Sequence, residues 1–223
     1  MNENLKLITS YSRHQEFADV FAKIQAKIES LFDWRWISYP EEAELIAAVI
    51  RNAEARQVLE LGMFTGFSTL HMIRAVYPVG KVVSVDARIC HDVEWFQQPD
   101  IARCFEFING HTPEIFPSLA GRMFDLVFID SDHSPEHCEK EVFGLWPYTH
   151  KGSIFMFHDL PRIQHPAATE DCVLRKWANS LVTRGHFTGV ILPSVYRVDC
   201  AREFGENYNR DLNPHMGIFI RKN

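Results

Sequence analysis

The segment that decides the fold is VLELGMFTGFSTL, residues 58–70. A short apolar run, a turn with Gly62 and Gly66 and a helix-like stretch follow one another, which predicts a strand, a tight turn and a helix. The two glycines allow a close approach of the backbone to a bound ligand, which a Cβ atom would obstruct; a plain structural turn is the alternative. The spacing is GxxxG, and neither GxGxxG nor the lysine of a phosphate-binding loop is present. No diphosphate site is therefore predicted, and a nicotinamide dehydrogenase is disfavoured.

Six further apolar runs follow this segment. Four of them alternate with helix-like stretches, a pattern typical of a parallel sheet with helical crossovers. These four runs are VVSV at 82–85, FEFI at 105–108, DLVFI at 125–129 and SIFMF at 153–157. Two later runs, HFTGVILP and MGIFIRK, are predicted to close the sheet, the last as an antiparallel strand. We predict an α/β fold, a Rossmann-like doubly wound and mostly parallel seven-stranded sheet with an N-terminal helical extension.

The N-terminal region has the periodicity of helices. Apolar residues recur at three- and four-residue steps between Gln15 and Leu31, which predicts an amphipathic packing helix. Pro40, Glu41 and Glu42 predict the start of a second helix, because proline suits the first turn and acids suit the positive end of the helix dipole. We expect a single domain over 1–223, with a helical cap at 1–40 and a Rossmann-like core at 41–223. The amphipathic helix could cover its own sheet or pair with a second copy in a homodimer.

Composition excludes several classes of function. At 223 residues and 46% hydrophobic content the chain can bury a full core, and its net charge of -6 offers nucleic acid no broad attraction. There is no apolar run long enough to span a membrane, and the N-terminus lacks a secretory signal pattern, so we expect a cytoplasmic protein. The five cysteines are scattered without a CxxC pair, which predicts free buried thiols.

Polar residues follow each of the first five predicted strands. In an open sheet of this kind the ligand site lies outside the carboxyl ends of the strands. Asp86 could there accept hydrogen bonds from both hydroxyls of a ribose, although a helix cap is the alternative. The residues after the five strands are Glu60 and Gly62, then Asp86, then Asn109 to Thr112, then Asp130 to His133, and finally His158 with Asp159.

The order of these motifs resembles a known family. VLELGMFTGFSTL, followed by VVSVDA and FDLVFIDSDH, resembles the class I methyltransferases of the catechol and caffeoyl-CoA O-methyltransferase group. FIDSDHSPEHCEKEV with GSIFMFHDL resembles the methyltransferase 24 family. The resemblance runs from about Trp36 to Asp159 and implies S-adenosylmethionine as cofactor. It also implies methyl transfer to a hydroxylated small molecule, with oxygen as the expected acceptor atom.

The resemblance implies a set of cofactor-binding residues. Asp86 would hold the ribose, Trp36 to Ser38 would cover the cofactor, and Asp130 would border the same site. His111 and Pro113 differ from the family's usual residues at the adenine contacts. The methionine part of the cofactor would be surrounded by Glu60, Gly62, Thr65, Gly66 and Ser68, and the adenine would meet Gly110, His111 and Thr112.

A metal site is implied at Asp130, His158 and Asp159. The family holds its cation with one acid and an Asp-Asn pair, whereas this sequence has His-Asp in place of the pair. Imidazole is a softer ligand than an oxygen and shifts the expected ion from magnesium toward manganese, iron or zinc. Alternatively, His158 is a neutral hydrogen-bonding group at the pocket floor, and Asp159 caps a helix or contacts substrate.

The base of the reaction is expected to be His133, which stands in the place of the family's catalytic lysine, with His158 as second choice and Asp130 beside them. With an ordinary pKa of about 6.5, a histidine is mostly neutral at pH 7 and can accept a proton. A dihistidine site of His133 and His137 is disfavoured, since Pro135 predicts that the helix starts after His133. N-methylation, another tailoring reaction with the same cofactor, and a non-catalytic nucleoside-binding module remain alternatives.

Overall fold

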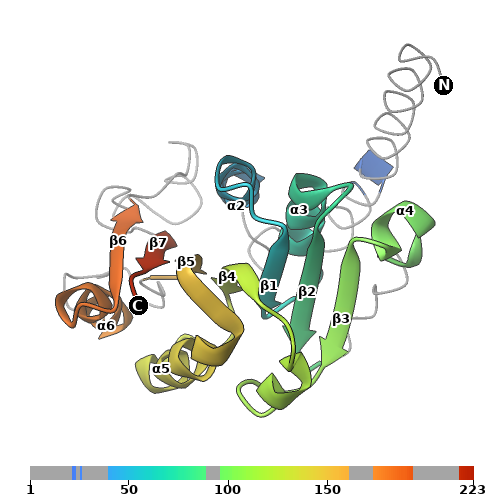
Figure 1. Cartoon of the computed structure of the whole chain (residues 1–223). Helices are drawn as coiled ribbons and strands as arrows, with labels where there is room; N and C mark the ends of the chain where they lie inside the picture. Colours follow the sequence, from blue (N-terminus) through green and yellow to red (C-terminus); the bar gives the residue numbers. More distant parts are fainter. Residues whose placement is uncertain (1–21, 24–25, 27–39, 89–95, 161–172, 193–215) are drawn as a thin grey trace, which may run out of the picture.

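The chain forms one twisted seven-stranded sheet with the strand order β3-β2-β1-β4-β5-β7-β6 (Figure 1). The computed structural model describes residues 22, 23, 26, 40–88, 96–160, 173–192 and 216–223. Strands β1 to β5 pair in parallel, and β7 runs antiparallel to both β5 and β6. All seven predicted strands and the antiparallel last strand are therefore confirmed. The strands are β1 Gln57–Leu61, β2 Lys81–Asp86, β3 Phe105–Asn109, β4 Phe124–Ile129, β5 Thr149–Phe157, β6 Phe187–Leu192 and β7 Met216–Arg221.

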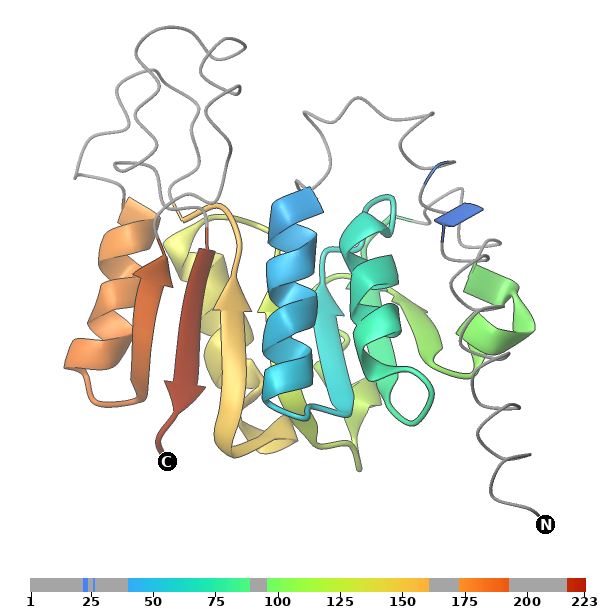
Figure 2. The same ribbon diagram turned by 90° about the horizontal axis from the view of Figure 1, so that it is seen from above.

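Helices cover both faces of the sheet, which confirms the doubly wound architecture. Figures 1 and 2 show α2 and α3 on one face and α5 and α6 on the other. Each face has its own apolar core, because successive side chains of a strand point to opposite sides. In β1, Val58 packs toward α2 and α3, whereas Leu59 belongs to the core on the opposite face. The helices are α2 Pro40–Asn52, α3 Phe67–Val76, α4 Pro99–Ala102, α5 Pro135–Gly144 and α6 Val173–Thr183, with 3-10 turns at Phe116–Leu119 and Trp146–Tyr148.

The predicted helix starts are observed at α2 and α5. Helix α5 begins at Pro135, and the hydroxyl of Ser134 accepts a hydrogen bond from the backbone N–H of His137. Proline and an N-capping serine both favour a helix start at this point. His133 is therefore held outside the helix, directly before the cap.

Some predictions fall outside the described residues. The helix expected from Gln15 to Leu31, the cap at 1–40 and the covering segment Trp36 to Ser38 lie there, apart from three helical residues at 22, 23 and 26. The single domain and the homodimer stay predictions. Among the described residues, no helix is both long and apolar enough to cross a membrane.

Candidate active site

The turn between β1 and α3 needs glycine at two positions. Gly62 has a φ of +92°, and a Cβ atom there would lie 2.2 Å from the carbonyl oxygen of Asp130. Gly66 has a φ of +82° at the N-cap of α3, and its Cβ atom would lie 2.5 Å from the ring of Phe96. The close approach observed at both glycines is to other parts of the chain, and an approach of this turn to a ligand stays a prediction.

Asp86 binds the same turn from the end of β2. Its carboxylate accepts hydrogen bonds from the backbone N–H groups of Met63 at 3.0 Å and Phe64 at 2.8 Å. A third bond comes from the N–H of Arg88 at 2.9 Å. Asp86 thus holds the glycine turn in place. Its Oδ2 already accepts two of these bonds, whereas Oδ1 accepts one and keeps a lone pair for a further donor.

Glu60 is a fully buried carboxylate beneath the turn. The hydroxyls of Ser68, Thr69 and Ser84 each donate a hydrogen bond of 2.5 Å to it. Burial raises the pKa of Glu60 to about 7, although the three hydrogen bonds oppose that shift. The carboxyl group therefore ties β1 to β2 and to the first turn of α3.

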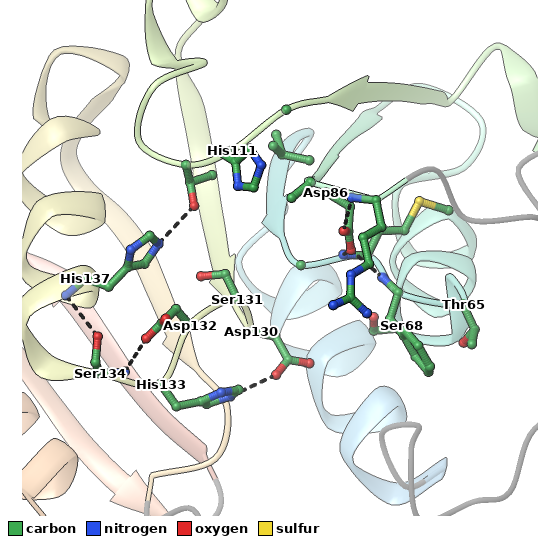
Figure 3. A pocket seen from close by; sticks show the side chains of 18 of the residues that line it. Thr65, Ser68, Asp86, His111, Asp130, Ser131, Asp132, His133, Ser134 and His137 are labelled. Carbon is green, nitrogen blue, oxygen red and sulfur yellow. Dashed lines mark hydrogen bonds and ion pairs between the residues drawn. The ribbon is translucent and has the colours of Figure 1, made fainter.

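A cavity of about 800 Å³ opens at the carboxyl ends of the strands (Figure 3). Its volume lies within the range of about 300–1,000 Å³ that is usual for small-molecule sites. Glu60 and Gly66, which were expected to contact a cofactor, are not among the residues that line it. His158 and Asp159, the expected metal ligands after β5, are not among them either. The predicted residues that do line the cavity are Gly62, Thr65, Ser68, Asp86, Gly110, His111, Thr112, Asp130 and His133.

A second buried carboxylate, Glu141, lies behind one wall of this cavity. It accepts hydrogen bonds from the hydroxyls of Thr112 at 2.5 Å and Ser131 at 2.6 Å, and it lies 3.0 Å from Nε2 of His137. Burial raises the pKa of Glu141 above its ordinary value, although these bonds oppose the shift. Glu141 was not among the residues predicted from the sequence. His137 therefore pairs with Glu141 and does not form a site together with His133, as expected from a helix start at Pro135.

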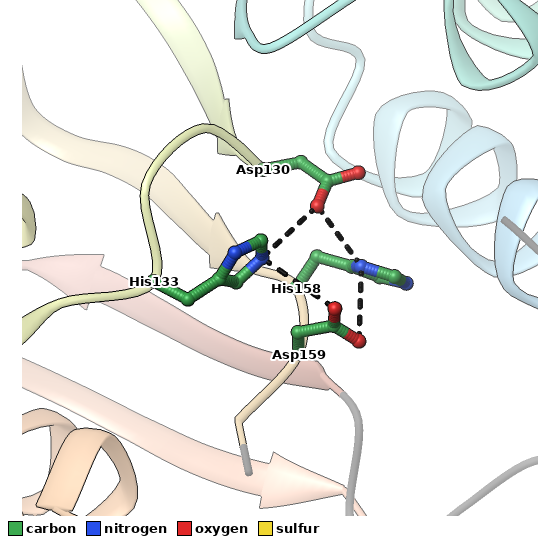
Figure 4. Close-up of side chains that lie close together, drawn as sticks. All are labelled: Asp130, His133, His158 and Asp159. Carbon is green, nitrogen blue, oxygen red and sulfur yellow. Dashed lines mark hydrogen bonds and ion pairs between the residues drawn. The ribbon is translucent and has the colours of Figure 1, made fainter. Parts of the chain in front are cut away.

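Four side chains converge at the ends of β4 and β5 (Figure 4). Nδ1 of His158 lies 3.0 Å from Oδ1 of Asp130 and 3.5 Å from Asp159. Nε2 of His133 lies 3.3 Å from Asp130 and 3.6 Å from Asp159. One ligand atom from each residue lies within 4.8 Å of all the others, so the set could hold a metal ion. We call these four residues the His-Asp cluster. The structure thus brings the three predicted metal ligands together and adds His133 to them.

The electrostatics of the cluster favour charged forms. Burial raises the pKa of Asp130, but the charge on His158 and hydrogen bonds from both histidines outweigh it and lower that pKa. Burial lowers the pKa of His133, but Asp130 and Asp159 outweigh it and raise that pKa. The pKa of His158 is raised well above its usual value, because Asp130, Glu42 and Asp159 outweigh burial. These carboxylates favour protonated His133, contrary to the expectation of a mostly neutral ring, and they also disfavour a neutral His158.

Glu42 is the functional candidate that the sequence analysis interpreted differently. It was assigned to the helix dipole, yet its side chain is fully buried and Oε2 lies 3.1 Å from Nε2 of His158. A signal was available, since Glu42, Ile46 and Ile50 recur at four-residue steps and so share the buried face of α2. A carboxylate on an apolar face indicates a specific buried partner.

Part of the chain is similar to known methyltransferases. Residues 59–160 match the methyltransferase 24 family, which is described as a methyltransferase domain. The chain resembles this methyltransferase family. It is also 35% identical over 95 residues to a catechol O-methyltransferase from Mycobacterium tuberculosis, a match that covers 41% of this chain and 43% of that enzyme. The chain thus spans less than half the length of this relative.

Solved methyltransferase structures share the fold. The cofactor-bound protein Rv0187 from MTB has a TM-score of 0.69 at 20% identity, covering 93% of this chain and 91% of that chain. The O-methyltransferase TomG from Streptomyces achromogenes, solved in complex with SAM, has a TM-score of 0.65 at 19% identity, covering 92% of this chain and 90% of that one. At such identities the likeness shows the fold, and it confirms the predicted Rossmann-like class.

Proposed function

We propose that this methyltransferase-like chain transfers a methyl group from S-adenosylmethionine to a hydroxyl oxygen of a small molecule. One observation carries the proposal: Asp130 and His133 belong both to the wall of the cavity and to the His-Asp cluster. Figure 3 shows them at one end of the cavity and His111 at the other. A nucleoside could therefore occupy one end while its reactive group faces the cluster.

The cavity suits this cofactor in shape and charge. Asp86 stands where a ribose would be held, and Thr65 and Ser68 add hydroxyl groups on the wall beside the glycine turn. Three carboxylates, those of Asp86, Asp130 and Asp132, line the cavity, against one guanidinium, that of Arg88. Their negative charge favours the positively charged sulfonium and ammonium groups of S-adenosylmethionine. The family match and the cofactor-bound neighbours support the same choice.

Transfer would be an in-line displacement. The acceptor oxygen forms a bond to the methyl carbon while the bond from that carbon to sulfur breaks and its electron pair stays on sulfur. A hydroxyl is a weak nucleophile until its proton is removed. His133 would accept that proton, and Asp130 and Asp159, at 3.3 and 3.6 Å from its Nε2, would stabilise the imidazolium that results.

The donor set of the cluster fits a divalent metal. One imidazole nitrogen, from His158, and two carboxylates, from Asp130 and Asp159, are a mixed set that suits manganese, iron or zinc better than magnesium. Asp130, His158 and Asp159 would hold the ion, with His133 at the cavity side. When bound, such a cation lowers the pKa of a nearby hydroxyl and offsets the carboxylate charges that favour protonated His133.

A methyl-transfer assay with matched histidine variants tests the proposal. Catechol is the first acceptor to try, because the M. tuberculosis relative is named for it. We expect His133→Ala to lower kcat by about 100-fold or more, since general base catalysis contributes about 10²- to 10⁴-fold. The control is His150→Ala at the opposite end of β5, where the ring lies 3.2 Å from Asp125 and is exposed.

Three outcomes are informative. Loss of activity in His133→Ala but not in His150→Ala supports the mechanism. Full activity in both Asp130→Ala and His133→Ala contradicts it. Transfer to an amine at a rate insensitive to His133 would indicate N-methylation, because a neutral amine needs less help from a base.

A further inference from the structure

Glu42 reaches the His-Asp cluster from a distant part of the chain. It lies in α2, 116 residues before His158, and none of its side chain is exposed. Its neighbours on the buried face of the helix are apolar, among them Ala43 and Ile46. A buried carboxylate among apolar groups is costly unless a partner stabilises it, and Nε2 of His158 lies 3.1 Å from its Oε2.

The two ring nitrogens of His158 face carboxylates on different elements. Nε2 faces Glu42 on α2, whereas Nδ1 faces Asp130 at 3.0 Å and Asp159 at 3.5 Å. Carboxylates accept hydrogen bonds, and a neutral imidazole has one N–H and one lone pair. Without a cation, Nδ1 donates its hydrogen to Asp130 and Nε2 donates to Glu42. When a cation takes the place of the Nδ1 hydrogen, the N–H on Nε2 stays with Glu42, and the lone pair on Nδ1 is directed at the ion between Asp130 and Asp159.

We propose that Glu42 is the positioning residue of His158: by accepting the Nε2 hydrogen, it orients the ring so that Nδ1 binds a divalent transition metal together with Asp130 and Asp159. This inference rests on the metal in the proposed function and extends it to α2. Carboxylate partners of this kind fix the tautomer and the orientation of metal-binding histidines, and their loss weakens metal binding by about 10- to 100-fold. The same contact fastens α2 to the end of β5.

Metal binding measured without any cofactor or acceptor tests the inference. Chelated protein is titrated with Mn²⁺ by calorimetry and with Co²⁺ by visible absorption, which reports the ligands around the ion. We expect Glu42→Ala to weaken binding of both ions by about 10- to 100-fold and to change the Co²⁺ spectrum. Glu42→Gln keeps an oxygen acceptor for the Nε2 hydrogen, so it should restore the spectrum and part of the affinity.

A matched control separates this role from general damage. Glu141 is another fully buried carboxylate, and it lies 3.0 Å from a histidine that is not in the cluster. Glu141→Gln should leave the Co²⁺ spectrum unchanged. If Glu42→Ala fails to fold, Glu42→Gln decides: binding of Mn²⁺ weaker than in the unaltered protein supports the inference, and unchanged affinity contradicts it.

Two results would overturn the inference. Unchanged affinity and spectrum in the Glu42 variants would make this residue a structural ion-pair partner only, and the proposed methyl transfer would stand. Absence of Mn²⁺ and Co²⁺ binding by the unaltered protein would also refute it. In that case S-adenosylmethionine binding and metal-independent transfer would show that the proposed activity survives.

Discussion

Substitution of Gly62 by alanine should destabilise the protein by more than the backbone conformation alone explains. The positive φ of +92° costs an alanine about 1–2 kcal/mol. Its Cβ atom would also lie 2.2 Å from the carbonyl oxygen of Asp130, so the ends of β1 and β4 must separate. Overpacking of this kind costs about 1–3 kcal/mol, which gives a total of about 2–5 kcal/mol.

Gly152 provides a matched control for this prediction. Its φ of +94° is nearly the same, and nothing lies within 4 Å of the Cβ position. Gly152→Ala should therefore lose only the conformational part, about 1–2 kcal/mol. Urea unfolding followed by circular dichroism measures both variants, and a common m-value makes their midpoints comparable.

The difference in the free energy of unfolding between the two variants measures the cost of the close contact at residue 62. We expect Gly62→Ala to be the less stable by about 1–3 kcal/mol. It should also bind S-adenosylmethionine more weakly, since the strained contact is to the backbone of Asp130. Equal destabilisation of Gly62→Ala and Gly152→Ala would refute the reasoning. It would show that the backbone of Asp130 can move away from the added Cβ atom without a loss of stability.

Three further predictions concern single groups. Asp86→Ala should weaken S-adenosylmethionine binding by about 10- to 100-fold, because a hydrogen bond to a charged group contributes about 1.5–3 kcal/mol. Calorimetry measures this affinity, and an unchanged affinity would exclude the ribose contact. The raised pKa of Glu60, about 7 against an ordinary 4.5, means that the folded protein holds this proton more tightly than the unfolded chain. The raised pKa therefore contributes about 3 kcal/mol to the free energy of unfolding below pH 4.5, and this contribution is lost as the pH rises through about 7. Urea unfolding measures the free energy of unfolding at pH 5 and at pH 8. The two values should differ less for Glu60→Gln than for the unaltered protein. The pKa of the Cys138 thiol is raised to about 12 by burial, so a thiol reagent at pH 8 should modify it only after unfolding, and rapid labelling of the folded protein would contradict its burial.

The sequence predicted the sheet well, for a physical reason. Strands buried on both faces are continuous apolar runs, and the turn and helix signals between them are local. The candidate site followed from the same pattern, because parallel strands place their carboxyl ends on one edge of the sheet. Asp86, Asp130 and His158 could be grouped in this way although they are far apart in the chain.

What the sequence did not predict depends on contacts between elements. Glu42 meets His158 only because α2 packs over the end of β5, and a glutamate in a first helical turn is equally consistent with a dipole interaction. Three hydroxyls from two other elements enclose Glu60, and no local pattern in the sequence indicates these contacts. The ionisation of His133 likewise depends on Asp159, which approaches from another strand.

The most direct test of the central claim is calorimetric titration of the protein with S-adenosylmethionine, once after chelation and once with added Mn²⁺. The account predicts binding at one site with a Kd on the order of micromolar, weakened in Asp86→Ala. It also predicts that Mn²⁺ changes the binding of cofactor or acceptor through the His-Asp cluster. Absence of binding in both conditions would contradict the account and reduce the methyltransferase assignment to a likeness of fold.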